Sequence, residues 1–240
     1  MRQGSSPPAQ EPKGGTAMQI SSRSWAVVAS LATWMIAMTA MAQHGLETLP
    51  EELAEAFVSL QTKVSDDPEA LEQVITAGRE RAVFCNTCHG PDGSATRVNY
   101  PSLASQNPVY LLDQIEQFAD GSRKKLVMNV LAETFSIEEK ITLALYYSAM
   151  PLVPTEADLE LARHGAPVYQ ARCAACHGPA GRGEEGYARI AGQQPGYVAA
   201  VLREYKSGQS PRRFSVMYGI ASALSENDID AVAHYIASMR

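Results

Sequence analysis

Positive charge is in short supply in this sequence. The 240 residues include 20 lysines and arginines against 26 aspartates and glutamates, which gives a formal net charge of -6. A nucleic-acid-binding surface needs an excess of clustered basic residues, so this class of function is disfavoured. Hydrophobic residues make up 45% of the chain and charged residues only 19%, as is typical of a globular rather than a disordered protein.

Cysteine is equally scarce, with four residues in the whole chain. Four thiols are too few to staple a chain of this length as a disulfide-rich protein. The sequence also lacks segments in which polar and apolar residues alternate, the pattern of a half-buried β-strand. The apolar periodicity that is present is helical, so the sequence predicts an all-α protein, and its length favours two small domains.

An uncharged segment near the N-terminus runs from Trp25 to Ala42. It follows an arginine and ends in Ala-Met-Ala, which is typical of a secretory signal with a small-residue cleavage site. We therefore expect residues 1–42 to be a leader and a cleaved signal peptide, with Met18 as a second candidate start. A retained membrane anchor is the other interpretation, because the segment approaches the length of a spanning helix.

The second half of the chain repeats the first. The segment from Cys85 to Gly93 matches that from Cys173 to Gly181, and residues 103–110 match residues 190–197 in the same order. Such ordered matches indicate a duplicated domain. The expected divisions are an acidic N-terminal extension at 43–70, one domain at 71–150 and a second at 151–240, which begins with an extended, proline-containing linker.

Each repeat has the same helix signals. An apolar-periodic segment precedes each cysteine cluster, and a helix is expected at 108–119 and again at 195–206, each with proline at its first position. A last helix is expected to open at a capping box, at Ser136 in the first repeat and Ser225 in the second. The sequence thus predicts about three helices per repeat joined by long loops. One more short amphipathic helix is expected at residues 50–60 of the extension.

Two glycines face aromatic positions in this helix pattern. Gly78 lies opposite Tyr146 in the first repeat, and Gly165 lies opposite Tyr235 in the second. Glycine permits close helix crossing, so the first and last helices of each repeat can approach one another here. The alternative is that both glycines end a helix.

All four cysteines belong to two Cys-x-x-Cys-His motifs. These motifs contain Cys85, Cys88 and His89 in the first repeat and Cys173, Cys176 and His177 in the second. The spacing is the signature of c-type haem attachment. Two thiols on one helical turn can add to the two vinyl groups of one porphyrin, and the next residue then offers an imidazole to the iron. The sequence therefore predicts two covalently bound haem c groups.

Other uses of the cysteines fit less well. A disulfide within each motif is possible, but it gives the following histidine no role. A zinc site made of all four thiolates likewise leaves both histidines unexplained. A thioredoxin-like redox pair requires a βαβ context that this sequence lacks.

A haem iron usually takes a second axial ligand, and methionine is found in that position in cytochromes c. Beyond residue 42 the chain contains Met128, Met150, Met217 and Met239. Met128 and Met217 correspond under the repeat and are expected in loops before the last helix, which favours them as ligands. Met150 and Met239 end that helix, where packing is the simpler role. The alternative for the favoured pair is that both fill the core.

Two further groups of residues have open roles. Basic residues lie shortly before the candidate ligands: Arg123, Lys124, Arg212 and Arg213. They either neutralise haem propionates or form a solvated charged loop. The histidines outside the motifs are interpreted as surface or packing residues: His44, His164 and His234.

The motifs together resemble a known family, the di-haem class I cytochromes c of the cytochrome c4 type. The resemblance covers residues 71–240 and rests on the duplicated Cys-x-x-Cys-His, the paired methionines, and two segments of similar sequence: Leu103-Ala104-x-Gln106-x-Pro108-x-Tyr110 and Ile190-Ala191-Gly192-Gln193-x-Pro195-x-Tyr197. It implies two cytochrome c folds related by a pseudo-twofold axis, with the haem propionates near their interface.

The resemblance also implies roles for individual residues. It implies thioether bonds at Cys85, Cys88, Cys173 and Cys176, proximal ligation by His89 and His177, and distal ligation by Met128 and Met217. In such cytochromes a backbone carbonyl at the position of Pro101 commonly bonds the proximal imidazole. The second repeat has Ala188 there, and any residue offers a carbonyl.

The function implied is that of a periplasmic carrier, which moves single electrons by outer-sphere transfer through two His/Met-ligated haems. Its partners would be an electron donor complex and a terminal oxidase or reductase, with membrane association through them or through an uncleaved N-terminus. The alternative is an electron-accepting subunit of a redox enzyme, such as a flavin-containing sulfide dehydrogenase. A di-haem peroxidase needs an iron with an open site, and nothing singles out one repeat for that. The extension at 43–70, which typical members lack, is a candidate docking element.

Overall fold

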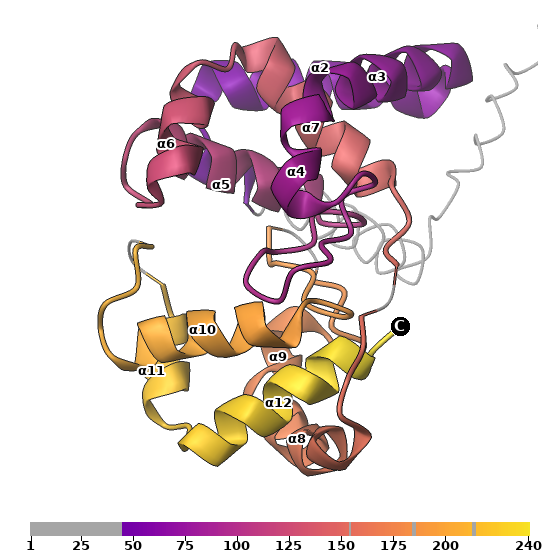
Figure 1. Ribbon diagram of the computed structural model, residues 1–240. Helices are drawn as coiled ribbons and strands as arrows, with labels where there is room; N and C mark the ends of the chain where they lie inside the picture. Colours follow the sequence, from indigo (N-terminus) through magenta and orange to yellow (C-terminus); the bar gives the residue numbers. More distant parts are fainter. Residues whose placement is uncertain (1–44, 154, 184–185, 213–214) are drawn as a thin grey trace, which may run out of the picture. The chain divides into compact units, whose positions relative to one another are not determined.

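The computed structural model describes residues 45–240, except 154, 184–185 and 213–214 (Figure 1). This part of the chain forms one compact unit and contains helices but no strand. The prediction of an all-α fold is therefore confirmed. The expected leader and signal at 1–42, and His44, lie outside the described residues. Among the described helices, none combines the length and apolarity needed to cross a membrane.

The acidic extension packs into the first repeat. The two together contain η1 (Leu46–Thr48), α2 (Glu51–Asp66), α3 (Pro68–Arg81), η2 (Ala82–Phe84), α4 (Asn86–His89), α5 (Pro108–Ala119), α6 (Leu126–Glu133) and α7 (Ile137–Ala149). Leu53 and Phe57 of α2 belong to the same hydrophobic core as Leu112 and Tyr146. The helix expected at 50–60 is thus present but longer. The expected boundary between residues 70 and 71 falls inside α3.

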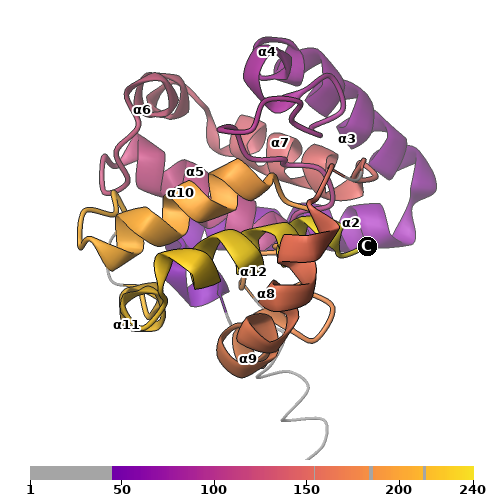
Figure 2. The ribbon, with the colours of Figure 1, turned by 60° about the horizontal axis from the view of Figure 1, so that its bottom comes forward.

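The described part of the second repeat has the same order of helices, without counterparts of η1, α2 and η2. It contains α8 (Leu159–Arg172), α9 (Ala174–His177), α10 (Pro195–Lys206), α11 (Met217–Ser222) and α12 (Glu226–Ser238). Figures 1 and 2 show α8 and α12 side by side, as α3 and α7 are in the first repeat. Tyr169, Ile229 and Val232 are fully buried between these helices and α10.

The helix boundaries follow the predicted signals. The helices expected at 108–119 and 195–206 are α5 and α10, with the expected bounds and with proline in the first turn. Both capping boxes form, between Ser136 and Glu139 at the start of α7 and between Ser225 and Asp228 at the start of α12. Three helices per repeat is too few, however. The short helices α4, α6, α9 and α11 are below the length at which apolar periodicity is detectable.

The glycine crossings are confirmed in both repeats. A Cβ on Gly78 would lie 2.3 Å from the Cβ of Tyr146, and a Cβ on Gly165 would lie 2.1 Å from the carbonyl oxygen of Ala231. Both glycines lie within helices, so neither acts as a helix end. The close approach of α3 to α7, and of α8 to α12, brings the segment that carries each cysteine motif onto the core.

Candidate functional site

Each Cys-x-x-Cys-His motif lies on a single helical turn, which follows α3 and η2 in the first repeat and α8 in the second. The N–H of His89 donates to the carbonyl of Cys85 at 2.9 Å, and the N–H of His177 donates to that of Cys173 at 3.0 Å. On such a turn, residues three and four apart lie on one face. Both thiols and the imidazole of each motif therefore share a face, as attachment to one planar group requires.

Burial disfavours ionisation of the first thiol of each motif. All four cysteines are free. Burial raises the pKa of the Cys85 thiol and raises that of Cys173 to about 11. A redox-active Cys-x-x-Cys pair depends on a lowered thiol pKa, so the raised pKa of Cys85 and Cys173 does not support that alternative. In the part of the chain that the structure describes, no cluster of three or more His, Cys, Asp and Glu residues is arranged to hold a metal ion.

The two motif histidines are held in the same way. The Nδ1 of His89 lies 2.8 Å from the carbonyl oxygen of Pro101, and the Nδ1 of His177 lies 2.9 Å from that of Ala188. A carbonyl oxygen only accepts, so Nδ1 carries the proton and Nε2 keeps a lone pair for a metal. Burial lowers the pKa of both imidazoles, which favours this neutral form. The carbonyl contact to the motif histidine, which the family resemblance implied, is therefore present in both repeats, from Pro101 in the first and from Ala188 in the second.

A tyrosine lies edge-on to each imidazole. The ring centroids of His89 and Tyr100 are 6.3 Å apart, and those of His177 and Tyr187 are 6.4 Å apart. Each tyrosine directly precedes the residue whose carbonyl holds the histidine. Sequence reasoning missed this pair, although Tyr100 and Tyr187 correspond under the repeat and the match between the two segments could have found them.

The candidate distal ligands lie in short helices, so the expectation of loops is wrong. Met128 is in α6, and Met217 is the first residue of α11. The side chain of Asn129 stabilises α6. Its Nδ2 donates to the carbonyls of Phe118 and Arg123, which ties α6 to the end of α5. At the start of α11, the Ser215 hydroxyl accepts from the N–H of Met217 at 3.2 Å.

Apolar side chains next to these methionines are exposed. Leu126 is 82% exposed and Val216 is 72% exposed. Large apolar side chains rarely face water in a group without a partner surface, so their exposure fits a pocket that a large apolar cofactor completes. Met150 and Met239 cap the last helices and pack against the two cores, and Met217 also packs against the core of the second repeat. That arrangement matches the packing role expected for Met150 and Met239.

Two arginines, one from each repeat, converge on a tyrosine. Arg123 donates to the hydroxyl of Tyr197 at 3.4 Å, and Arg212 donates to it at 2.8 Å. Arg123 is buried, and its Nε is a donor without a partner among the described residues. Burial, followed by the charge of Arg212, lowers the pKa of Arg123. A solvated loop is therefore wrong for Arg123. A buried cation with an unused donor fits an anionic group such as a haem propionate.

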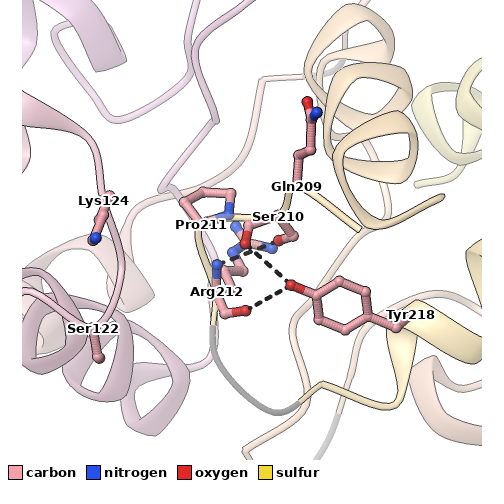
Figure 3. Close-up of a pocket in the computed structure, with 7 residues that line it drawn as sticks. All are labelled: Ser122, Lys124, Gln209, Ser210, Pro211, Arg212 and Tyr218. Carbon is pink, nitrogen blue, oxygen red and sulfur yellow. Dashed lines mark hydrogen bonds between the residues drawn. The ribbon is translucent and has the colours of Figure 1, made fainter. Parts of the chain in front are cut away.

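A pocket of about 530 Å³ lies beside this cluster (Figure 3). Ser122 and Lys124 line it from the first repeat, and residues 209–212 with Tyr218 line it from the second. The hydroxyl of Tyr218 lies 3.1 and 3.2 Å from two carbonyl oxygens of this loop. Arg213 lies outside the described residues. The pocket thus places basic side chains of both repeats around one open space.

The remaining described histidines have structural roles. His164 is exposed and lies 3.5 Å from Glu160. The Nδ1 of His234 accepts from the N–H of Asp158, at the start of α8. Neither contact brings a histidine to a cysteine motif, in agreement with the surface or packing role expected for both.

Comparison with known proteins gives consistent matches. Residues 162–240 match the family model for cytochrome c. The chain is 32% identical over 184 residues to cytochrome c4 of Azotobacter vinelandii, covering 68% of this chain and 88% of that protein. It is 30% identical over 203 residues to the thiosulfate dehydrogenase electron acceptor of Stutzerimonas stutzeri, covering 78% and 92%. The crystal structure of reduced recombinant cytochrome c4 from Pseudomonas stutzeri superposes with a TM-score of 0.65 at 30% identity, covering 69% and 98%.

Proposed function

Since this chain belongs to the cytochrome c4 family, we propose that it carries single electrons between respiratory-chain proteins in the periplasm. Two covalently bound haem c groups are its cofactors, and electron transfer is the activity of the family. The finer assignments of compartment, ligands and partners are our proposal. The single observation that carries it is the duplicated geometry in which a motif histidine donates from Nδ1 to a backbone carbonyl and keeps Nε2 for iron.

In the proposed sites the residues that bind haem divide into three kinds. The thioether bonds form at Cys85, Cys88, Cys173 and Cys176, the proximal ligands are His89 and His177, and the distal ligands are Met128 and Met217. When bound, each haem supplies an iron that changes oxidation state by one electron while its ligands stay in place. The carbonyls of Pro101 and Ala188 fix the orientation of the imidazoles, which limits rearrangement during transfer.

Charge on the protein has two proposed uses. Arg123, which is buried, and Arg212, which is partly buried, supply positive charge to the haem carboxylates, because the Nε of Arg123 has no partner among the described residues. The acidic surface of the chain favours basic patches on protein partners and speeds their encounter at low salt. The uncharged segment at 25–42 supports export to the periplasm.

A second candidate role is that of direct electron acceptor for a dehydrogenase. It is favoured by the matches to proteins named thiosulfate dehydrogenase electron acceptor, one of which is 31% identical over 180 residues. The chemistry of the haems is the same in both roles, so only the donor differs. Rapid reduction by a purified thiosulfate dehydrogenase with thiosulfate, and none by quinol-oxidising membranes, would favour this second role.

A spectroelectrochemical titration tests the ligand assignment. The protein is produced in a host that attaches haem c, and its mass should exceed that of the polypeptide by two haems. Met128→Ala and Met217→Ala should each lower one of the two reduction potentials, because loss of the thioether removes a ligand that raises the potential. Met150→Ala and Met239→Ala are matched controls and should leave both potentials near wild type. Two unchanged potentials in the first pair would reassign the distal ligands.

A further inference from the structure

Two buried glutamines form reciprocal contacts between the repeats. Gln106 of the first repeat binds the backbone of Arg189 in the second: Oε1 accepts from the N–H at 2.7 Å and Nε2 donates to the carbonyl at 2.8 Å. Gln193 of the second repeat binds the backbone of Ser102 in the first with the same pair of bonds, at 2.7 and 3.0 Å. Gln106 and Gln193 correspond under the repeat, so one arrangement occurs twice.

The peptide unit that each glutamine holds is the one that holds a motif histidine. The N–H of Arg189 and the carbonyl of Ala188 belong to one peptide unit, and that carbonyl accepts from Nδ1 of His177. In the same way, the N–H of Ser102 shares a peptide unit with the Pro101 carbonyl, which accepts from His89. A continuous hydrogen-bonded chain therefore runs from a glutamine in one repeat to the histidine of the other.

Resting on the proposed ligation, we propose that Gln106 and Gln193 are positioning residues that each tune the reduction potential of the haem in the opposite repeat. Peptide resonance couples the two ends of the unit. An acceptor at the N–H therefore increases negative charge on the carbonyl oxygen and strengthens the bond that this oxygen accepts. A stronger bond to Nδ1–H makes Nε2 a better electron donor, which stabilises oxidised iron and lowers the potential.

A purely structural role has a different signature. Cross-repeat bonds that only hold the halves together would affect stability, with no reason to act on one haem. The chain offers a matched control in Gln194, which is equally buried at 7% exposed and donates from Nε2 to the carbonyl of Ala95 across the same interface. This bond does not involve a peptide unit that holds a histidine.

The experiment measures both potentials of the holoprotein, with each haem assigned to its repeat by nuclear Overhauser contacts between haem methyls and nearby side chains. Gln106→Leu should raise the potential of the second-repeat haem, and Gln193→Leu that of the first. The expected change is about threefold in the redox equilibrium constant, the effect of one modest hydrogen bond. Gln194→Leu should shift neither. Gln106→Glu keeps an oxygen toward the Arg189 N–H, so it should bring the second-repeat potential back toward the wild-type value.

The outcomes separate the two proposals. Three outcomes would overturn the proposed effect of each glutamine on the haem of the opposite repeat. These are a potential shift confined to the haem of the mutated repeat, equal shifts in both haems, and no shift in a folded variant. The Nδ1–H resonance of His177 should move in Gln106→Leu and stay unchanged in Gln194→Leu. If Gln106→Leu does not fold, the Gln106→Glu protein is titrated instead, and ionisation of the new carboxyl should lower only the second-repeat potential. A wild-type protein without two His/Met haems would instead contradict the proposed function.

Discussion

The two repeats fill the same space with tyrosines from different helices. In the first repeat, a Cβ on Gly93 would lie 2.7 Å from the ring of Tyr147, which comes from the last helix. In the second, a Cβ on Gly181 would lie 3.2 Å from the hydroxyl of Tyr169, which comes from the first helix. Both glycines have positive φ. The turn after each motif therefore packs against a tyrosine ring, and this tyrosine comes from the last helix in the first repeat and from α8 in the second.

The surroundings of the two motifs differ in tightness. A Cβ on Gly90, after the first motif, would lie 2.1 Å from the carbonyl oxygen of Ser94, whereas one on Gly178 would meet nothing within 4 Å. His89 is buried and His177 only partly so. The first repeat also has α2 on its core. The two sites thus share their hydrogen-bond geometry but not their packing, so substitutions at matched positions should have unequal effects.

The largest expected difference concerns the helix crossings. Gly165→Ala should destabilise the protein by about 3 kcal/mol, because the new methyl would meet the backbone carbonyl of Ala231, which cannot move without shifting α12. Gly78→Ala should cost about 2 kcal/mol, because the new methyl meets the Cβ of Tyr146 at 2.3 Å, an atom fixed to α7, but comes no closer than 3.2 Å to a main-chain atom. Urea unfolding of the holoprotein, followed by circular dichroism, measures both.

Gly219→Ala is the control for these substitutions. It lies in α11 and has no atom within 4 Å of the new Cβ, so the helix propensity of alanine should stabilise the protein by up to about 1 kcal/mol. Equal losses for Gly78→Ala and Gly165→Ala would show that backbone and side-chain obstacles are equally rigid here, contrary to the comparison.

The capping boxes should respond to acid with unequal strength. The N–H of Ser136 lowers the pKa of Glu139, and the hydroxyl of Ser225 lowers that of Asp228. A carboxyl with a lowered folded-state pKa adds stability above its unfolded pKa of about 4, and this stability is lost as the pH falls through the folded value. Glu139 also pairs with Arg81 at 2.6 Å, and no ion pair of Asp228 is found among the described residues of the second repeat.

Glu139→Gln should therefore lose more stability at pH 7 than Asp228→Asn. We expect losses of about 1 kcal/mol and about 0.5 kcal/mol, since both carboxyls are largely solvated. As the pH falls through the lowered folded-state pKa of each carboxyl, both variants should approach wild type, because the native carboxyls become protonated. Unfolding at a series of pH values checks this, with Glu138→Gln as the neighbouring control. Losses that persist undiminished in acid would mean that charge does not carry the effect.

Sequence reasoning succeeded where the signal is local. Proline at Pro108 and Pro195, and serine at Ser136 and Ser225, mark helix starts because caps act within one turn. The placement of the candidate methionines was missed, since a short helix such as α11 is decided by contacts rather than periodicity. The glutamine contacts join residues 83 and 91 positions apart, so only the packed repeats display them.

The smallest expected effect of a single substitution lies in a turn that both repeats tie to the last helix. The N–H of Ser105 donates to the carbonyl of Tyr147, and the N–H of Gly192 donates to that of Ile236, each at 2.8 Å. Both residues have positive φ, 59° for Ser105 and 68° for Gly192. A left-handed conformation costs a non-glycine residue about 1 kcal/mol, and the flexibility of unfolded glycine offsets a similar amount.

Ser105→Gly should therefore change the free energy of unfolding by less than about 0.5 kcal/mol, because the two effects nearly cancel. Gly192→Ser should cost about 1 to 2 kcal/mol, since it adds backbone strain and brings a Cβ within 2.6 Å of a Leu152 methyl. Denaturant unfolding of the two variants resolves this asymmetry. A strongly stabilising Ser105→Gly would contradict this prediction. It would mean that the left-handed conformation of Ser105 costs more free energy than its hydrogen bond to α7 contributes. The two turns would then differ in strain although both make the same hydrogen bond.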